Sequence, residues 1–231
     1  MMKFMFTPLE SHSDYGFGEV ARSFEQAADK IAEEAKAILW MHAQFPINYL
    51  YRHAVELYLK SCIIIVQRYL NGGTINVSDI KIGEKRRSIT NTHSLKSLFD
   101  HFRNLVTENK TKIEIGKRSK WSEIPDDLPR LIDEIEKYDS RSIYFRYPGL
   151  EKTAIEAEKS TMKEIDPLVL MEKLKSEKGI CTYLELNEND EIEKGYVLDR
   201  SALSGCQELL KKASSHLSGA SIGLRVELAG G

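Results

Sequence analysis

The stretch Asn48-Tyr-Leu-Tyr-Arg-His-Ala-Val-Glu-Leu-Tyr-Leu-Lys-Ser-Cys-Ile-Ile-Ile-Val-Gln-Arg-Tyr-Leu70 decides the fold of this chain. It contains no Gly or Pro, so nothing in it interrupts a helix. On a helical wheel its apolar side chains fall on nearly every side, which is typical of a buried, central helix. It carries too many charges to span a membrane.

One narrow stripe of this helix is polar. Arg52, Glu56 and Lys60 follow one another at i, i+4 and i+8, with Tyr49 and His53 beside them. Because an unpaired buried charge costs several kcal/mol, a central helix with this stripe needs polar partners. We therefore expect the rest of the chain to bring polar groups against the stripe.

The composition is that of an ordinary globular chain, with 231 residues, 42% hydrophobic and 29% charged. This length allows one large domain or two small ones. The net charge is -2, but residues 81–120 hold 11 Lys and Arg against 4 Asp and Glu, and residues 121–166 hold 7 against 12. The basic segment is either an anion-facing patch or a solvated loop and helix face.

Cysteine usage and hydropathy predict a cytoplasmic protein that is not inserted in a membrane. Cys62, Cys181 and Cys206 show no CxxC spacing, which favours a reducing compartment over a disulfide framework or a zinc site. The N-terminal stretch becomes polar too quickly for a signal peptide, and no run reaches the roughly 18 apolar residues of a membrane helix. No HxxxH or HExxH pattern is present, so we expect no metal and no cofactor.

Apolar periodicity predicts further helices on both sides of the central one. They are expected at residues 17–44, 95–106, 126–139, 167–178 and 201–217. Mobile basic loops are expected at 74–91 and 109–120, and an extended aromatic segment at 141–148. Two short strands, 181–186 and 196–198, are expected around the turn-rich Asn187-Glu-Asn-Asp190, and residues 218–231 are expected to be a loose tail.

Four local motifs sharpen this picture: Phe24-Glu-Gln-Ala-Ala-Asp29, Arg52-His-Ala-Val-Glu-Leu-Tyr-Leu-Lys60, Thr92-His-Ser-Leu-Lys-Ser-Leu98, and Tyr138-Asp-Ser followed by Phe145-Arg-Tyr-Pro148. Over residues 14–150 the chain resembles a group of bacterial HEPN-superfamily proteins. The resemblance implies a mostly all-α, antiparallel bundle of four to five helices that dimerises. We expect this HEPN-like bundle at 14–178, a small β-hairpin insertion at 179–200, a helix packing on the bundle at 201–217 and a flexible tail at 218–231.

The resemblance also implies a function. Members of the superfamily include metal-independent ribonucleases of toxin and antiphage defence systems, and non-catalytic partners of nucleotidyltransferases. The ribonucleases carry Arg, four to six residues and then His, a pair that promotes attack of a ribose 2′-OH on the adjacent phosphate. Here the matching pair is Arg87 and His93, but it precedes the third predicted helix instead of opening a late one. Either the active site is built differently or catalysis is absent.

The remaining polar candidates form one expected cluster. Its members are Arg52, His53, Glu56, Lys60, His93, Asp139, Ser140 and Arg146. The cluster is either a pocket for phosphate or nucleotide, or a buried ion-pair network in which Arg52 pairs with Asp139 and Glu56 with Arg146. His93 can point toward the stripe only if the third helix begins after it, at the cap Ser94.

Two functions remain open at this point. The first is an RNA-directed protein of a bacterial toxin or antiphage system, acting as a metal-independent endoribonuclease through Arg87 and His93. The second is a non-catalytic module that dimerises, binds a nucleotide or joins a partner protein encoded in the same operon. Tyr144, Phe145 and Tyr147 either stack on bases or anchor the packing beside Pro148.

Overall fold

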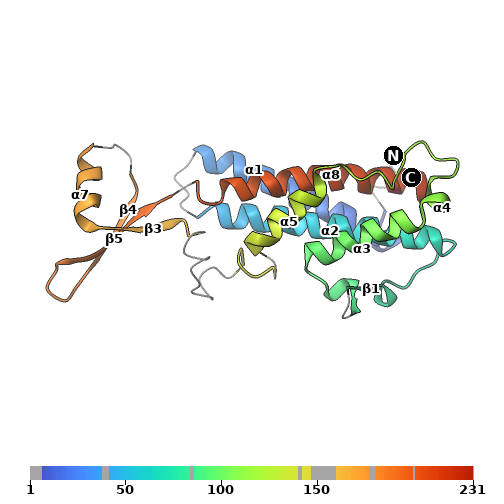
Figure 1. Ribbon diagram of the computed structural model, residues 1–231, viewed down its shortest axis with the longest axis horizontal. Coiled ribbons are helices and arrows are strands. Elements are labelled where there is room, and N and C mark those ends of the chain that lie inside the picture. Colours follow the sequence, from blue (N-terminus) through green and yellow to red (C-terminus); the bar gives the residue numbers. More distant parts are fainter. Residues whose placement is uncertain are drawn as a thin grey trace.

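The structure, a computed structural model, is mostly helical, as the periodicity predicts (Figure 1). It describes residues 7–37, 42–83, 86–139, 142–146, 160–176, 180–199 and 201–230. Within that part, an elongated bundle is formed by α1 (Phe17–Ala37), α2 (Gln44–Leu70), α3 (Leu95–Glu108), α5 (Leu128–Asp139) and α8 (Ser204–Leu228). A short 3-10 turn, η2 (Leu9–Ser11), precedes α1. No helix among the described residues is both long enough and apolar enough to cross a bilayer.

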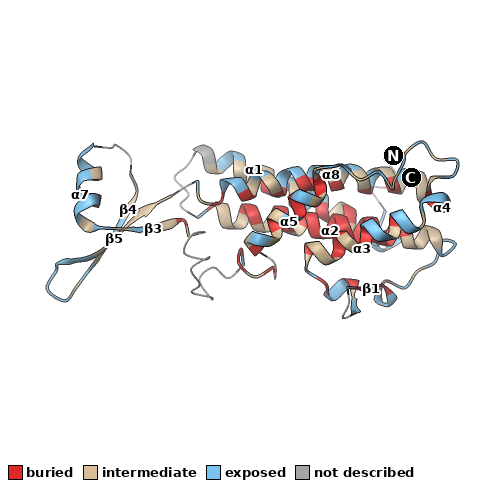
Figure 2. Cartoon of the chain, in the orientation of Figure 1, coloured by how far each residue is buried: buried red, intermediate tan, exposed pale blue. Residues whose placement is uncertain are grey.

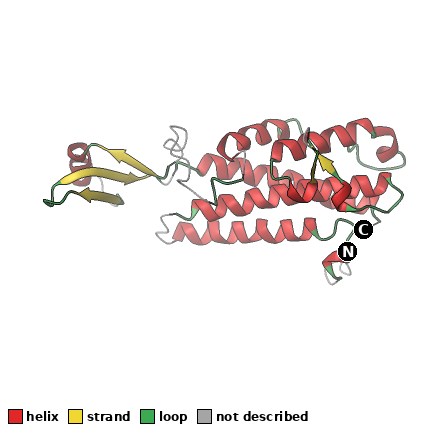
Figure 3. Cartoon of the chain, turned by 90° about the horizontal axis from the view of Figure 1, so that it is seen from below, coloured by secondary structure: helices red, strands yellow, loops and turns green. Residues whose placement is uncertain are grey.

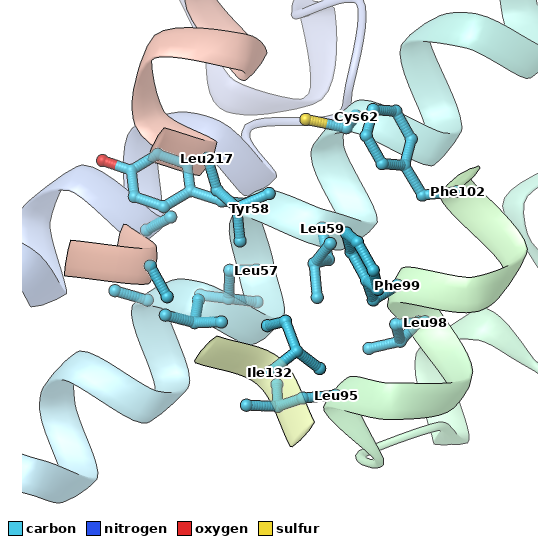
Figure 4. Packing of buried hydrophobic residues seen from close by; sticks show 14 of the residues in the cluster. Leu57, Tyr58, Leu59, Cys62, Leu95, Leu98, Phe99, Phe102, Ile132 and Leu217 are labelled. Atoms are coloured by element: carbon cyan, nitrogen blue, oxygen red, sulfur yellow. The ribbon is translucent and has the colours of Figure 1, made fainter. Parts of the chain in front are cut away.

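Helix α2 is the centre of the bundle (Figure 2). Between Tyr51 and Val66 every residue except His53 is buried. Helices α1 and α8 pack on one side of α2 and α3 packs on another, while α5 lies against α3 and α8. Figure 4 shows side chains of α3, α5 and α8 directed at α2. Because each fully buried Leu or Ile contributes about 1.5–3 kcal/mol, this one helix carries much of the hydrophobic stabilisation.

Polar bonds fix how α1 and α8 lie against α2. The hydroxyl of Tyr51 donates to Asp29 of α1 at 2.6 Å, and that of Tyr58 donates to Glu25 at 2.8 Å. Ser214 of α8 donates to the same Glu25 at 2.7 Å. A half-buried carboxylate between three helices is satisfied by such donors, so these bonds set one register for the packing.

The C-terminal segment expected to be a loose tail is instead the end of a long helix. Helix α8 runs to Leu228, and Leu224 is buried. The side chain of Glu227 accepts hydrogen bonds from Ser119 Oγ at 2.8 Å and Trp121 Nε1 at 3.0 Å. The expectation of a flexible tail, which rested on the tendency of chain ends to be loose, was wrong because tertiary contacts hold this helix almost to its end.

Both segments expected to be basic loops contain short elements. Residues 74–91 hold η3 (Val77–Asp79), η4 (Ile89–Asn91) and an antiparallel pair of β1 (Lys81–Ile82) with β2 (Arg87–Ser88). Ile82 and Ile89 are fully buried and anchor this segment to the bundle. Helix α4 (Lys110–Glu114) lies in the second segment, where Ile113 is buried. Isolated isoleucines in polar segments carry no periodicity, so the sequence did not predict these anchors.

The aromatic segment after α5 is a turn where it is described, not the expected extended segment. Ser142 has a φ of 59°, and Arg146 N donates to the carbonyl of Ile143 at 3.0 Å. Tyr144 and Phe145 are buried against the core, so they serve as packing anchors rather than as stacking platforms for bases. Tyr147 and Pro148 lie outside the described residues.

A small α/β unit projects beyond one end of the bundle (Figures 1 and 3). We call it the arm and define it as residues 160–176 and 180–199. Its three-stranded antiparallel sheet has the order β3-β5-β4 and is made of β3 (Met162–Ile165), β4 (Thr182–Leu186) and β5 (Ile192–Leu198). Helix α7 (Pro167–Ser176) packs on β5 through Leu170, which lies over Gly195.

The arm corrects the expected boundaries. Residues 160–176 belong with the sheet and not with the bundle, which was expected to continue to 178. The second strand of the 181–198 region begins at Ile192 instead of Tyr196. The third strand, β3, was missed because it has only four residues, Met-Lys-Glu-Ile, without apolar and polar alternation, and is followed at once by Asp166-Pro167.

The two interior glycines of α8 predict opposite effects when replaced by Ala. A Cβ at Gly223 would lie 2.4 Å from Trp121 Cη2, whereas a Cβ at Gly219 would meet nothing within 4 Å. Gly219→Ala should stabilise the protein by about 0.5–1 kcal/mol through helix propensity. Gly223→Ala should destabilise it, because Trp121 must leave its bond to Glu227. Urea midpoints measure both, and equal shifts in one direction would contradict the docking of Trp121.

Candidate functional site

The polar stripe of α2 is buried and internally paired. Arg52, Glu56 and Lys60 are only 1%, 1% and 3% exposed. Lys60 Nζ lies 2.8 Å from Glu56 Oε1, and Arg52 Nη1 lies 3.5 Å from Glu56 Oε2. One carboxylate therefore accepts from the cations one turn before it and one turn after it, as the i, i+4 spacing allows.

Arg52 joins α2 to two distant segments. Its Nε lies 3.3 Å from Asp139 Oδ2, its Nη1 donates to Ser142 Oγ at 2.8 Å, and its Nη2 donates to the carbonyl of His93 at 2.9 Å. The pairing of Arg52 with Asp139 is the one expected for a buried network. The planar fork of donors on a guanidinium suits this role, because it reaches several acceptors without a change of rotamer.

Two acidic residues of α5 complete the surroundings of Arg52. Asp139 Oδ1 accepts from the backbone N–H groups of Ile143 and Tyr144 at 2.7 and 3.1 Å. Glu136 Oε1 accepts from the backbone N–H of Lys96 at 2.8 Å and so contacts the first turn of α3. Burial raises the pKa of Glu136 above its ordinary value despite these bonds. The loops on both sides of the site are thus fixed by carboxylates.

The charge state of Glu56 follows from its partners. Burial acts to raise the pKa of this carboxyl group, but the ion pair and hydrogen bond with Lys60, together with His93, outweigh burial and hold its pKa below the ordinary value. Glu56 is therefore ionised at neutral pH, where a carboxylate can only accept hydrogen bonds.

His93 connects this network to the surface. Helix α3 begins at Leu95, and Ser94 caps it by accepting from Ser97 N at 3.1 Å, so His93 lies in the entering loop. Its Nδ1 is 3.0 Å from Glu56 Oε1, and its side chain is 50% exposed. Because the ionised carboxylate accepts, Nδ1 must carry the proton of this bond. A neutral imidazole then has Nε2 free of a proton and able to act as a base.

His93 forms part of the wall of an open groove of about 820 Å³ between α3 and the β1–β2 pair. The groove is lined by Lys81, Ile82, Gly83, Arg86, Arg87, Thr92, His93, Ser94, Ser97, Asp100, His101 and Asn104. Three cations, Lys81, Arg86 and Arg87, thus share it with two histidines, and all three are exposed. The structure brings Arg87 and His93, the pair matched by spacing, to one groove.

Other candidates lie elsewhere. His53 stacks on Tyr49 at 5.9 Å and contacts Phe24 edge-on at 4.6 Å, and burial lowers its pKa below the ordinary value. Arg146 Nε donates to the carbonyl of Ser142 at 2.6 Å, and Glu56 has Lys60 and His93 where Arg146 was expected. Ser140 lies outside the described residues.

This arrangement separates the expected cluster into two layers. One layer is a buried ion-pair network formed by Arg52, Glu56, Lys60 and Asp139. These charges pair with one another, so they are not available to bind a phosphate. The groove above them has cations that the cluster did not include, Lys81 and Arg86, and a second histidine, His101. Their positions depend on the β1–β2 fold of the segment, for which the sequence carries no periodic signal.

Metal binding has no visible basis in the described part of the chain, where no three His, Cys, Asp or Glu residues are grouped to hold an ion. Comparisons with protein-family models, with curated proteins and with solved structures find no match for this chain. The chain is therefore described by its structure: a helical bundle with a buried ion-pair network beneath a basic groove that is lined by histidine.

The depressed pKa of Glu56 predicts how stability depends on pH. The group binds fewer protons in the folded than in the unfolded state, so its contribution is full above about 4.5, its ordinary value, and is lost as pH falls through the folded pKa. Glu56→Gln imitates the protonated form: among the described residues it takes away the one carboxylate that pairs with buried Lys60, and it leaves Arg52 with Asp139 as its ionic partner. It should cost about 3–5 kcal/mol at neutral pH, and this difference from wild type should shrink on acidification.

The matched control is Glu33→Gln, whose side chain is 68% exposed and pairs with Lys30 on the surface of α1. It should change stability by less than about 0.5 kcal/mol at any pH. Urea unfolding of the three proteins across pH measures both effects. A Glu56→Gln difference that stays constant down to acid pH would contradict the ionised, buried pair.

Proposed function

We propose that this chain is an RNA-directed protein of the bacterial toxin or antiphage defence type, acting as a metal-independent endoribonuclease in the groove between α3 and the β1–β2 pair. The observation that carries the proposal is the position of His93. One ring nitrogen is held by the buried Glu56 at 3.0 Å, while the half-exposed ring lines a groove with three cations. A carboxylate–imidazole pair of this kind orients a general base.

The chemistry assigned to the groove is transfer within RNA. His93 Nε2 takes the proton of a ribose 2′-OH, and the 2′-oxygen forms a bond to the adjacent phosphorus. The bond from phosphorus to the 5′-oxygen then breaks, and that oxygen takes a proton from solvent. The products are a 2′,3′-cyclic phosphate and a 5′-hydroxyl end. Arg87 and Arg86 lie where they can balance the charge that develops on the phosphate oxygens.

The direct test is RNA cleavage in the presence of EDTA. Wild type should cut single-stranded RNA, and His93→Ala should reduce the rate about 100-fold or more, as expected for loss of a general base. His216→Ala is the control, because His216 of α8 pairs with Asp127 and does not line the groove. Cleavage that requires a divalent ion, or that survives in His93→Ala, would refute the assignment.

Binding of RNA in the groove should depend on salt. Each phosphate contact that is lost should reduce the slope of log affinity against log salt by about 0.7 for a single strand. Arg86→Ala with Arg87→Ala should therefore flatten the slope. The matched control is Lys30→Ala with Arg130→Ala, since each of these residues pairs with a glutamate on its own helix, outside the groove. An equal change in the two double variants would leave the groove without a role.

A second candidate is a non-catalytic module that binds a nucleotide, a second copy or a partner protein. What favours it is the arm, which carries exposed apolar residues far from the groove. An inert protein that still binds RNA in the groove, or that still associates, would support this candidate over the ribonuclease.

A further inference from the structure

The arm is small but carries most of the large apolar side chains that are exposed in the described residues. Among the described residues, twelve large hydrophobic side chains are exposed, and seven of them belong to the arm. They are Leu168, Val169, Met171, Leu174, Tyr183, Leu186 and Ile192. Figure 2 shows α7 with little burial. A unit of about 40 residues buries only a small core, here centred on Leu170, and a concentration of exposed apolar side chains of this kind marks an interaction surface.

The outer side of α7 is the clearest part of that surface. Leu168 is 77% exposed and Met171 is 42% exposed, one turn apart on the same side of the helix, while Leu170 is buried against the sheet. Between the arm and the bundle no pair of described elements makes an extensive contact. The bundle of the same molecule therefore leaves this face open.

The arm is acidic, which favours a basic partner surface. Residues 160–199 contain ten Asp and Glu against five Lys. The hairpin tip between β4 and β5 is the most acidic part, with Glu188, Asp190 and Glu191 in succession. In the described hairpin the one cation, Lys194, pairs with Glu185 at 3.8 Å. The charge and the exposed side chains of the arm thus favour a partner whose surface is apolar and has cations beside it.

The same chain offers such cations. Residues 81–120 hold the excess of Lys and Arg, and Arg86 and Arg87 are exposed on the wall of the groove. The arm projects beyond one end of the elongated bundle, whereas β1 and α4 lie toward the other end (Figures 1 and 3). Two copies that pair side by side in opposite directions bring the arm of each copy to the basic end of the other.

We propose that the arm is a dimerisation element: the apolar face of α7 packs on a second copy of this chain, and the acidic hairpin tip lies against the basic segment 81–120 of that copy. The interface is two-fold symmetric, so each copy gives its arm and receives the other. Charge complementarity sets the orientation, and burial of the apolar side chains supplies the affinity. The basic segment includes Arg86 and Arg87 of the groove, so the arm is tested by molecular mass in solution and not by RNA cleavage.

The first test measures the molecular mass in solution by sedimentation of the full chain. Wild type should be a dimer, and Leu168→Glu with Met171→Glu should be a monomer with the same helical circular dichroism, since both residues are exposed. Ser23→Glu with Gln26→Glu adds two carboxylates to the exposed face of α1 and should leave the dimer intact. A monomeric wild type, as would be found if the surface served another protein, overturns the proposal.

A charge exchange tests which surfaces meet. One variant reverses the tip by Glu188→Lys, Asp190→Lys and Glu191→Lys, and another reverses the receiving side by Arg86→Glu and Arg87→Glu. Each alone should be mainly monomeric at moderate salt. Mixed in equal amounts they should form a heterodimer, because one contact is then wild type and the other has both signs reversed. A mixture that stays monomeric while wild type dimerises refutes the contact between tip and basic segment.

Discussion

The guanidinium of Arg52 is the interaction on which the rest of the site depends. It is 1% exposed and contacts the loop before α3, the end of α5 and the turn after α5. At His93 and Ser142 the backbone is irregular, so the arginine supplies there the order that hydrogen-bond ladders supply elsewhere. Removing it would take from Asp139 its ion-pair partner and from Glu56 one of its two buried cationic partners.

This buried network has a consequence at the surface. Because Arg52 holds the carbonyl of His93 and Glu56 holds its Nδ1, the backbone and the ring of one residue are fixed by two neighbours on the same helix. The network itself is too enclosed to bind a phosphate. It acts as a support, and the exposed edge of His93 is the part that a ligand in the groove can reach.

The sequence predicted the buried ion-pair network better than it predicted the groove. The i, i+4, i+8 spacing on an otherwise apolar helix showed that Arg52, Glu56 and Lys60 are buried and need partners, and Asp139 was found among them. The partner Ser142 was missed, because its position depends on a turn with a positive φ that no periodicity signals. Lys81 and Arg86 were read as charges of a basic segment that was either an anion-facing patch or a solvated loop, and were not placed beside His93, because short strands without alternation look like loop.

Long-range contacts also decide where α8 ends and how many strands the arm has. Helix α8 was expected to end before its glycines, yet Gly223 is the residue that admits Trp121 and so ties the helix to a loop a hundred residues away in sequence. The arm was read as a hairpin, and its third strand escaped notice because pairing between distant segments leaves no local pattern. Local signals thus predicted the helices, and long-range contacts decided their ends.

The most direct test of the central claim is the protonation of the two ring nitrogens of His93, measured by nitrogen NMR on the folded protein at a pH where the ring is neutral. The account predicts a proton on Nδ1, held by Glu56, and none on Nε2, and a loss of this preference in Glu56→Gln. A proton on Nε2 in the wild type, or a tautomer that does not respond to Glu56→Gln, would contradict the claim that the buried network orients His93 toward the groove.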